Sequence, residues 1–188
     1  MKEFNNINSI ESLYRQNQLR AKESVDTRCL QSRHRVSTLS EPVVELIAYC
    51  LNSNHYHLLM KQIVDKGVSK FMHKLGMGYT KYFNDKNNRS GSLFQGAYKV
   101  VPAESTDQLI YLSCYINGNP EIHKIAKAEK YIWSSYQDYL GERNGIMCNK
   151  NIILENFKNI QEYKDLVDLV IKESSSRKDE MKKYILEN

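Results

Sequence analysis

No run of apolar residues in this sequence is long enough to cross a membrane as a helix. The longest one, Val43–Leu51, contains Glu45 and is far shorter than the ~20 residues that a membrane-spanning helix needs. Met1 is not followed by an apolar signal segment either. We therefore expect a cytoplasmic protein with no membrane partner.

Cysteine is scarce, and its spacing argues against the common cysteine-based frameworks. The four cysteines, Cys29, Cys50, Cys114 and Cys148, are far apart and form no CxxC pair. Structural zinc sites and disulfide-rich folds use closely spaced cysteines in regular patterns. We expect reduced thiols in an intracellular protein.

Neither sign of charge dominates the chain. The 188 residues carry 27 Lys and Arg against 22 Asp and Glu, which gives a net charge of +5. Such a mild basic excess permits a phosphate-bearing partner without requiring one. With 41% hydrophobic and 26% charged residues, the composition is that of an ordinary globular protein with one main domain and an appendage.

A hairpin is the clearest local prediction. Large apolar and β-branched residues predict a buried strand over Val43–Leu51, and His55–Gln62 has the composition of a second strand. The segment between them, Asn52-Ser53-Asn54, consists of turn-forming residues. The two strands should therefore pair through a short connection.

Helical spacing follows the hairpin. Apolar residues three to four apart predict a helix from Val68 to Phe83, and a third strand is expected over Leu93–Val101. Polar residues of the loop 84–92 separate these two elements. The amphipathic pattern of residues 152–188 predicts C-terminal helices, and residues 1–41 are expected to form a short helix and a polar loop.

A capping signal predicts a further helix. Ser105 fits an N-cap, with Gln108 three residues later as in a capping box. The helix should run to about Asn117, because Gly118 and Pro120 are typical helix stops.

His55 and His57 are candidate metal ligands. Residues two apart on a strand point to the same face, so both imidazoles would project together. Imidazole binds several transition metals, and two such ligands leave room for oxygen ligands. Two unrelated histidines at the start of a strand are the alternative, and the remaining histidines, His34, His73 and His123, are isolated in the sequence.

Tyr115 and Asn119 are spaced by one helical turn. A tyrosine hydroxyl has a free pKa of about 10, so it needs a cation nearby to act as a nucleophile on a phosphate. The amide oxygen of Asn119 could complete a metal site. Ordinary core packing is the alternative for Tyr115, since the chain has 13 tyrosines.

Basic and aromatic residues alternate between these two elements. Lysines can follow a phosphate backbone while aromatic rings stack on unpaired bases. A solvated helix face over an ordinary core is the alternative. The candidate DNA-binding residues are Lys70, Lys74, Lys81, Arg89 and Lys99.

Taken together, several segments resemble the REP-associated tyrosine transposases, a branch of the single-tyrosine HUH transposases. The segment 48–59, with its HYH sequence, resembles the HUH strand of that family, and the segments 79–84 and 89–96 resemble its next block. The segments 115–120 and 133–136 resemble its tyrosine helix and the stretch that follows.

The resemblance implies a ferredoxin-like α+β fold with an antiparallel sheet, packed helices and C-terminal helices, usually as a homodimer. It implies cleavage and rejoining of single-stranded or hairpin DNA in transposition, through a 5′-phosphotyrosine and with Mg²⁺ or Mn²⁺. Tyr115 would be the nucleophile, and His55, His57 and Asn119 the metal ligands.

The resemblance also suggests an organisation of the chain. We expect an N-terminal helix and polar loop over 1–41, the HUH domain over 42–140 and a helical extension over 141–188. No counterpart of the family's first strand precedes the hairpin, so that strand is expected to be missing, with an unpaired sheet edge in its place. Two other functions stay open: a hairpin DNA-binding protein that has lost cleavage, by truncation or domestication, and an unrelated HxH metal hydrolase whose nucleophile is water.

Overall fold

The computed structural model describes residues 41–186, so the helix and loop expected over 1–41 lie almost entirely outside it. The described chain forms two compact units. The first contains residues 41–45 and 62–100, and the second contains residues 46–61 and 101–186. The fold class is α+β, as predicted, and none of the helices within the described range is long and apolar enough to cross a membrane. The expected boundaries at residues 42 and 140 stay a prediction.

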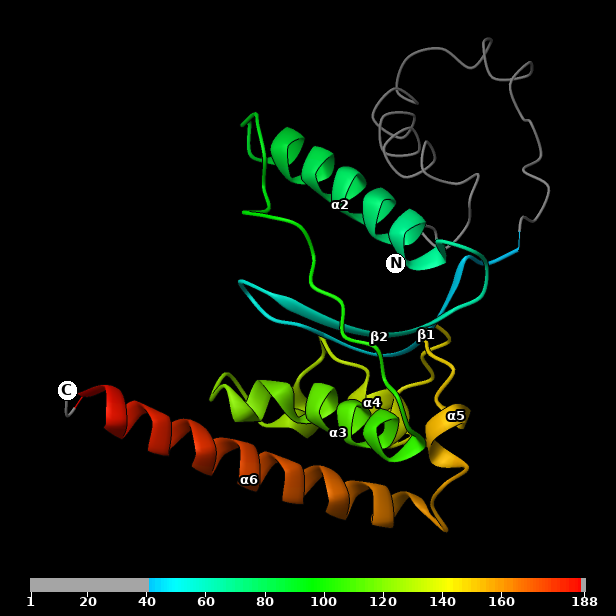
Figure 1. Ribbon diagram of the computed structural model, residues 1–188, viewed down its shortest axis with the longest axis vertical. Coiled ribbons are helices and arrows are strands. Elements are labelled where there is room, and N and C mark those ends of the chain that lie inside the picture. The colour runs from blue at the N-terminus through cyan, green and yellow to red at the C-terminus, as the bar shows by residue number, and fades with distance from the viewer. Residues whose placement is uncertain (1–40, 187–188) are drawn as a thin grey trace. The chain divides into compact units, whose positions relative to one another are not determined.

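The predicted hairpin is present. Strand β1 (Val44–Leu51) pairs with strand β2 (Tyr56–Gln62) in a sheet that has two strands in the described part of the chain (Figure 1). The Asn52 N–H donates to the His55 carbonyl at 2.9 Å and closes the turn, which makes the pair antiparallel. His55 therefore stands just before β2, one residue earlier than the strand itself.

The other edge of β1 is also hydrogen-bonded. Cys50 forms an antiparallel bridge with Ser134, and the Leu51 N–H donates to the Trp133 carbonyl at 2.9 Å. The Ser135 N–H donates to the Tyr49 carbonyl at the same distance. A later segment therefore pairs with the end of β1, whereas β2 has no second partner strand among the described residues. The expectation of an unpaired sheet edge stays a prediction.

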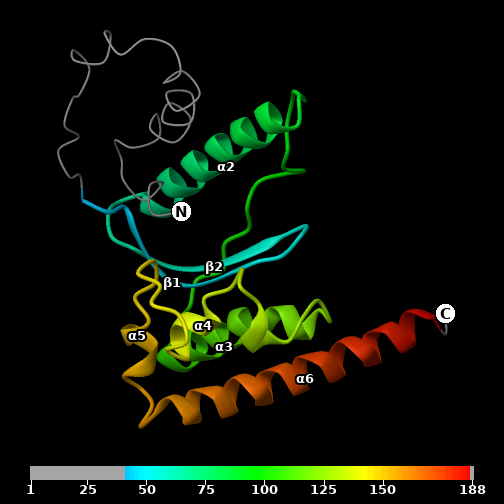
Figure 2. The same ribbon diagram turned by 180° about the vertical axis from the view of Figure 1, so that it is seen from behind.

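Two long helices dominate the second unit. The helices α3 (Thr106–Ile122) and α6 (Ile160–Leu186) pack against each other (Figures 1 and 2). They run in the same direction, because Ser113 in the middle of α3 lies by Tyr163 near the start of α6, and the later Gly118 lies by the later Ile171. Shorter elements complete the unit: η2 (Ala128–Lys130), α4 (Tyr136–Tyr139) and α5 (Asn151–Leu154).

A buried polar network ties α3 to its surroundings. Asn117 donates to the Tyr163 hydroxyl at 2.8 Å and accepts from the Ser135 hydroxyl at 2.6 Å. Ser135 in turn accepts from the Tyr49 N–H at 3.0 Å. Since buried polar groups are costly when unpaired, this chain of contacts fixes the position of α3 relative to both β1 and α6.

The end predicted for α3 is wrong. Its start is capped as expected, with the Ser105 hydroxyl accepting from the Gln108 N–H at 3.1 Å, but the helix continues through Gly118 and Pro120 to Ile122. Gly118 serves close packing instead, since a Cβ there would lie 2.6 Å from Ile171 Cγ1. Pro120 is tolerated in the last turn.

A Schellman motif ends α3 further on. Lys124 has a φ of 58°, and its N–H donates to the Glu121 carbonyl at 2.9 Å. The Ile125 N–H donates to the Pro120 carbonyl at 2.8 Å. This pair of bonds satisfies the last carbonyls of the helix, so the stop lies after Ile122 instead of at Asn117.

The first unit is built around helix α2 (Gly67–Lys86), which buries Phe71 and Met72. Gly67 is required at its start, because a Cβ would lie 2.1 Å from the Val43 carbonyl oxygen. The strand predicted over Leu93–Val101 is absent. Those residues have the apolar character of a strand but no partner strand within the described chain, and Val101 is 75% exposed.

Candidate functional site

The turn of the hairpin brings the two predicted metal-binding histidines together. The ring centroids of His55 and His57 lie 5.1 Å apart, with their planes at 83°. Both side chains are half-buried. The two-residue spacing therefore has the geometric consequence expected from the sequence, although His55 precedes the strand.

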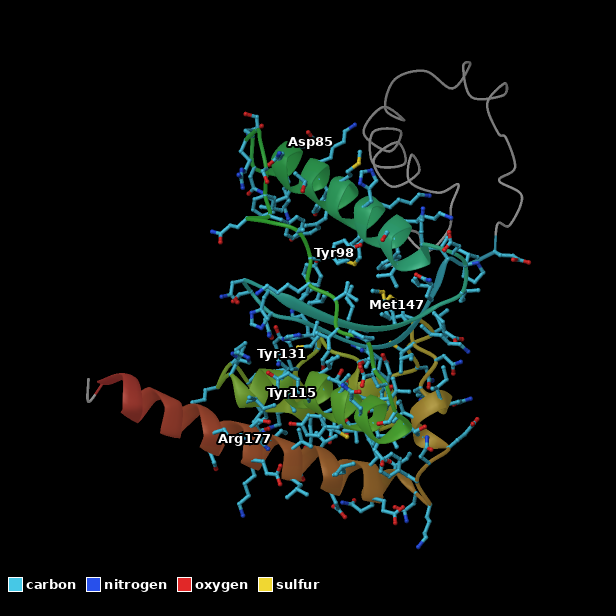
Figure 3. All side chains as sticks on the ribbon, viewed as in Figure 1. Asp85, Tyr98, Tyr115, Tyr131, Met147 and Arg177 are labelled. Atoms are coloured by element: carbon cyan, nitrogen blue, oxygen red, sulfur yellow. The ribbon has the colours of Figure 1, made fainter. Side chains whose placement is uncertain are left out.

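Helix α3 brings Tyr115 and Asn119 to the same place. The Tyr115 ring centroid lies 5.9 Å from that of His57, and Tyr115 is labelled on α3 in Figure 3. Asn119 follows one turn later and is fully buried. Because α3 continues past Gly118, both residues keep the common helix face that their spacing predicts.

Asn52 connects the hairpin turn to α3. Its Nδ2 donates to Asn119 Oδ1 at 2.6 Å and lies 2.9 Å from His55 Nε2. The other ring nitrogen of His55, Nδ1, lies 2.7 Å from Asn54 Oδ1. Asn52 is not among the predicted site residues, although the predicted turn places residue 52 opposite residue 55.

His123 is exposed, as expected, but it has a neighbour that the sequence does not predict. It follows the last residue of α3, and its ring centroid lies 5.1 Å from that of His55, so it is exposed but not isolated. The extension of α3 to Ile122 carries His123 toward the hairpin turn. A prediction that ended the helix at Asn117 could not find this neighbour.

Burial sets the acidity of Tyr115. Loss of water raises the pKa of its phenol, Tyr111 raises it further, and the amide of Asn119 opposes the rise. The hydroxyl is therefore a weaker acid than a free tyrosine at this site. It can act as a nucleophile only with positive charge close by.

The donor set fits a divalent cation of mixed nitrogen and oxygen preference. The described residues include no group of three or more His, Cys, Asp and Glu arranged to hold a metal. The site instead offers two imidazoles and amide oxygens. With metal–nitrogen bonds of about 2.1 Å, two rings on one ion have centroids roughly 5 Å apart, in line with the 5.1 Å between His55 and His57. With His55 Nδ1–H donating to Asn54 Oδ1, its Nε2 carries a lone pair, and the Asn52 N–H₂ group then lies between two acceptors, His55 Nε2 and Asn119 Oδ1.

The basic residues expected to bind DNA lie in the first unit. Lys70, Lys74 and Lys81 are on α2, where Lys74 is half-buried and its pKa is lowered by loss of water. Arg89 and Lys99 are exposed in the segment after the helix, and the Arg89 guanidinium lies 5.6 Å from the centroid of the Phe83 ring. His55, His57 and Tyr115 lie in the second unit.

Comparison with known proteins identifies a family. The family model described as "Transposase IS200 like" matches residues 10–119, more than half of the 188 residues, and the match includes His55, His57, Tyr115 and Asn119. No curated protein and no solved structure matches the chain. On this match, the chain belongs to the IS200-like transposase family, which gives it a role in DNA transposition and DNA as its partner.

Proposed function

We propose that this transposase cleaves and rejoins single-stranded DNA, folded as a hairpin, with Tyr115 as its nucleophile. His55, His57 and Asn119 would hold the divalent cation, Mg²⁺ or Mn²⁺. The observation that supports this proposal is the cluster itself: the Tyr115 ring lies 5.9 Å from His57, and His57 lies 5.1 Å from His55. The buried Asn119 follows one helical turn after Tyr115.

The proposed reaction is a transesterification. The Tyr115 Oη–phosphorus bond forms while the bond from phosphorus to the 3′ oxygen breaks. The phenol gives its proton to water, and the departing 3′ oxygen takes one up. The products are a 5′-phosphotyrosine and a free 3′-hydroxyl. Attack of a 3′-hydroxyl on the phosphotyrosine reverses the step, so rejoining needs no external energy source.

The protein prepares this step by placement. The network around Asn117 fixes α3, so Tyr115 is presented from a rigid helix. Burial keeps the phenol protonated until DNA arrives, since its pKa is raised. A bound Mg²⁺ or Mn²⁺ supplies the positive charge that polarises the phosphate and favours the phenolate.

The first unit would contribute to DNA binding. Lys70, Lys74, Lys81, Arg89 and Lys99 are proposed to contact phosphates, and the exposed rings of Tyr79 and Tyr82 to stack on bases. If each cation contacts one phosphate of a single strand, its removal lowers the slope of log affinity against log salt by about 0.7. Lys158 is an exposed residue of the second unit and serves as the control substitution.

The resemblance to HUH transposases also supports a homodimer. Light scattering of the purified chain measures this directly, because a dimer doubles the mass of 22.0 kDa. A monomer at all concentrations, with and without DNA, would contradict the proposal.

Covalent trapping tests the nuclease. The protein is incubated with labelled hairpin DNA that carries a single-stranded flank, together with Mn²⁺, and separated on a denaturing gel. We expect a protein–DNA adduct in the wild type and none in Tyr115→Phe. Tyr111→Phe is the matched control, because Tyr111 lies one turn earlier on the same helix and should leave the adduct intact.

The outcomes separate the candidate functions. An adduct that persists in Tyr115→Phe rules out this tyrosine as nucleophile, and nicking without an adduct favours a hydrolase that uses water. DNA binding without any cleavage favours the cleavage-dead binding protein. His55→Ala should abolish cleavage, whereas His73→Ala, on an exposed position of α2, should not.

A further inference from the structure

Asn52 stands at the centre of the cluster described above, at the corner of the hairpin. One amide nitrogen, Nδ2, meets two acceptors from different elements: Asn119 Oδ1 at 2.6 Å and His55 Nε2 at 2.9 Å. The amide oxygen on the other side accepts from the Cys50 thiol at 3.4 Å. The Asn52 side chain is half-buried.

The two acceptors are the atoms through which His55 and Asn119 would bind a cation. The lone pairs of His55 Nε2 and Asn119 Oδ1 are stabilised by positive charge between them. The N–H₂ group of Asn52 supplies partial positive charge there, and a bound cation would supply it in the same way. The Asn52 amide nitrogen thus lies next to both proposed ligand residues, His55 and Asn119. Asn119 is fully buried, and its Oδ1 accepts from the Asn52 amide at 2.6 Å.

The amide can also present its other end. A half turn of the Asn52 carboxamide exchanges nitrogen and oxygen, which are similar in size, and puts Oδ1 beside His55 and Asn119. Cys50 suits either orientation, because a thiol can donate weakly through S–H and accept weakly through sulfur. An amide oxygen is a hard donor of the kind that Mg²⁺ and Mn²⁺ accept.

We propose that Asn52 is a further ligand of the cation site. Without the cation its Nδ2 bridges His55 and Asn119, and with the cation its carboxamide turns over and Oδ1 binds the ion beside His55, His57 and Asn119. This inference rests on the proposed function, since it assumes that these three residues hold the ion. It adds a residue from the hairpin turn to a site otherwise made by two histidines and α3.

Direct measurement of Mn²⁺ binding, without DNA, tests the role of Asn52. Free Mn²⁺ is quantified by electron paramagnetic resonance during titration of the full-length protein. We expect Asn52→Leu to weaken binding about tenfold or more, and Asn52→Asp to restore or exceed the wild-type affinity, because a carboxylate supplies the same oxygen with added charge. Ser53→Ala, at an exposed neighbouring turn position, should bind as the wild type does.

The variants separate this inference from the proposed function. If His57→Ala loses Mn²⁺ binding but Asn52→Leu keeps it, the site exists and Asn52 is not a ligand. Tighter binding in Asn52→Leu would also overturn the proposal, because it would make Asn52 a competitor of the ion. If His57→Ala leaves Mn²⁺ binding unchanged, the metal assignment itself fails. Thermal unfolding of each variant shows whether it is folded, and Asn52→Asp decides the question should Asn52→Leu be unfolded.

Discussion

Gly118 offers the sharpest test of how α3 is held. The residue lies between Tyr115 and Asn119, and α6 passes directly over it. A Cβ added there would lie 2.6 Å from Ile171 Cγ1 and 3.2 Å from Ile171 Cδ1. Both atoms belong to one half-buried side chain, so its truncation removes the whole conflict.

Two opposing effects set the magnitude of Gly118→Ala. Alanine in place of glycine inside a helix stabilises by about 1 kcal/mol. Overlap with a packed neighbour costs about 1–3 kcal/mol. We therefore expect Gly118→Ala to lower the free energy of unfolding by about 1 kcal/mol in the wild type. In an Ile171→Ala background the overlap is gone, and the same substitution should raise it by about 1 kcal/mol.

Urea unfolding followed by circular dichroism measures all four members of this cycle. Gly76→Ala is the control, because Gly76 lies in α2 with no atom within 4 Å of an added Cβ, so it should stabilise in either background. The reasoning is refuted if Gly118→Ala has the same effect with and without the Ile171 side chain. It is also refuted if Gly118→Ala stabilises the wild type as Gly76→Ala does.

Three further predictions concern stability. Lys124→Gly should raise the free energy of unfolding by about 1 kcal/mol, and Tm by about 2–4 °C, because Lys124 has a φ of 58° that glycine adopts freely; a lower Tm in thermal unfolding would contradict this. Arg143→Lys should lower the free energy of unfolding in urea by about 2–4 kcal/mol. Arg143 Nε and one terminal nitrogen donate to the two oxygens of the buried Asp138 at 2.7 and 2.8 Å, and an ammonium group cannot make both hydrogen bonds in this geometry. An unchanged midpoint of unfolding would argue that the pair is dispensable. Burial raises the pKa of the Cys50 thiol to about 12 and that of Cys114 to about 11, from an ordinary 9.0. Below pH 9 both thiols are protonated in the folded and the unfolded chain, and above pH 9 only the unfolded chain releases these protons. The free energy of unfolding should therefore fall by about 1.4 kcal/mol per thiol by pH 10. Cys114→Ala, measured by urea unfolding at pH 8 and pH 10, should lose less stability over this interval than the wild type.

The sequence predicts those parts of the fold that local pattern decides. The hairpin, the amphipathic α2 and the Ser105 cap follow from periodicity and turn chemistry, and each is present. Residues 93–101 have the composition of a strand without forming one, because a strand needs a partner that composition does not reveal.

The predicted end of α3 is wrong because it, too, depends on a contact that composition does not reveal. Gly118 and Pro120 end many helices, but the packing of Ile171 over Gly118 is a tertiary contact between residues far apart in the chain. The actual stop, at Lys124, uses a residue type that rarely adopts a positive φ.

The residues of the site also fall into those that the sequence predicts and those that it does not. His55, His57, Tyr115 and Asn119 could be singled out from two-residue and four-residue spacing, and the structure brings all four together. Asn52 reaches the site through the predicted turn, whose composition does not show that its side chain contacts α3. His123 reaches it through the extra turn of α3, which the sequence does not predict.

The pairing of residues 133–135 with the edge of β1 has a consequence during translation. Tyr49 and Ser135, which pair at this edge, are 86 residues apart. At a translation rate of about 5–20 residues per second, β1 leaves the ribosome roughly 4–17 s before its cover exists. A product that ends before Ser135 never acquires that cover, and its exposed edge can pair with the same edge of another chain. Prematurely terminated copies of this protein are therefore expected to collect in the insoluble fraction of the cell, whereas chains that extend past Ser135 pair the end of β1 themselves.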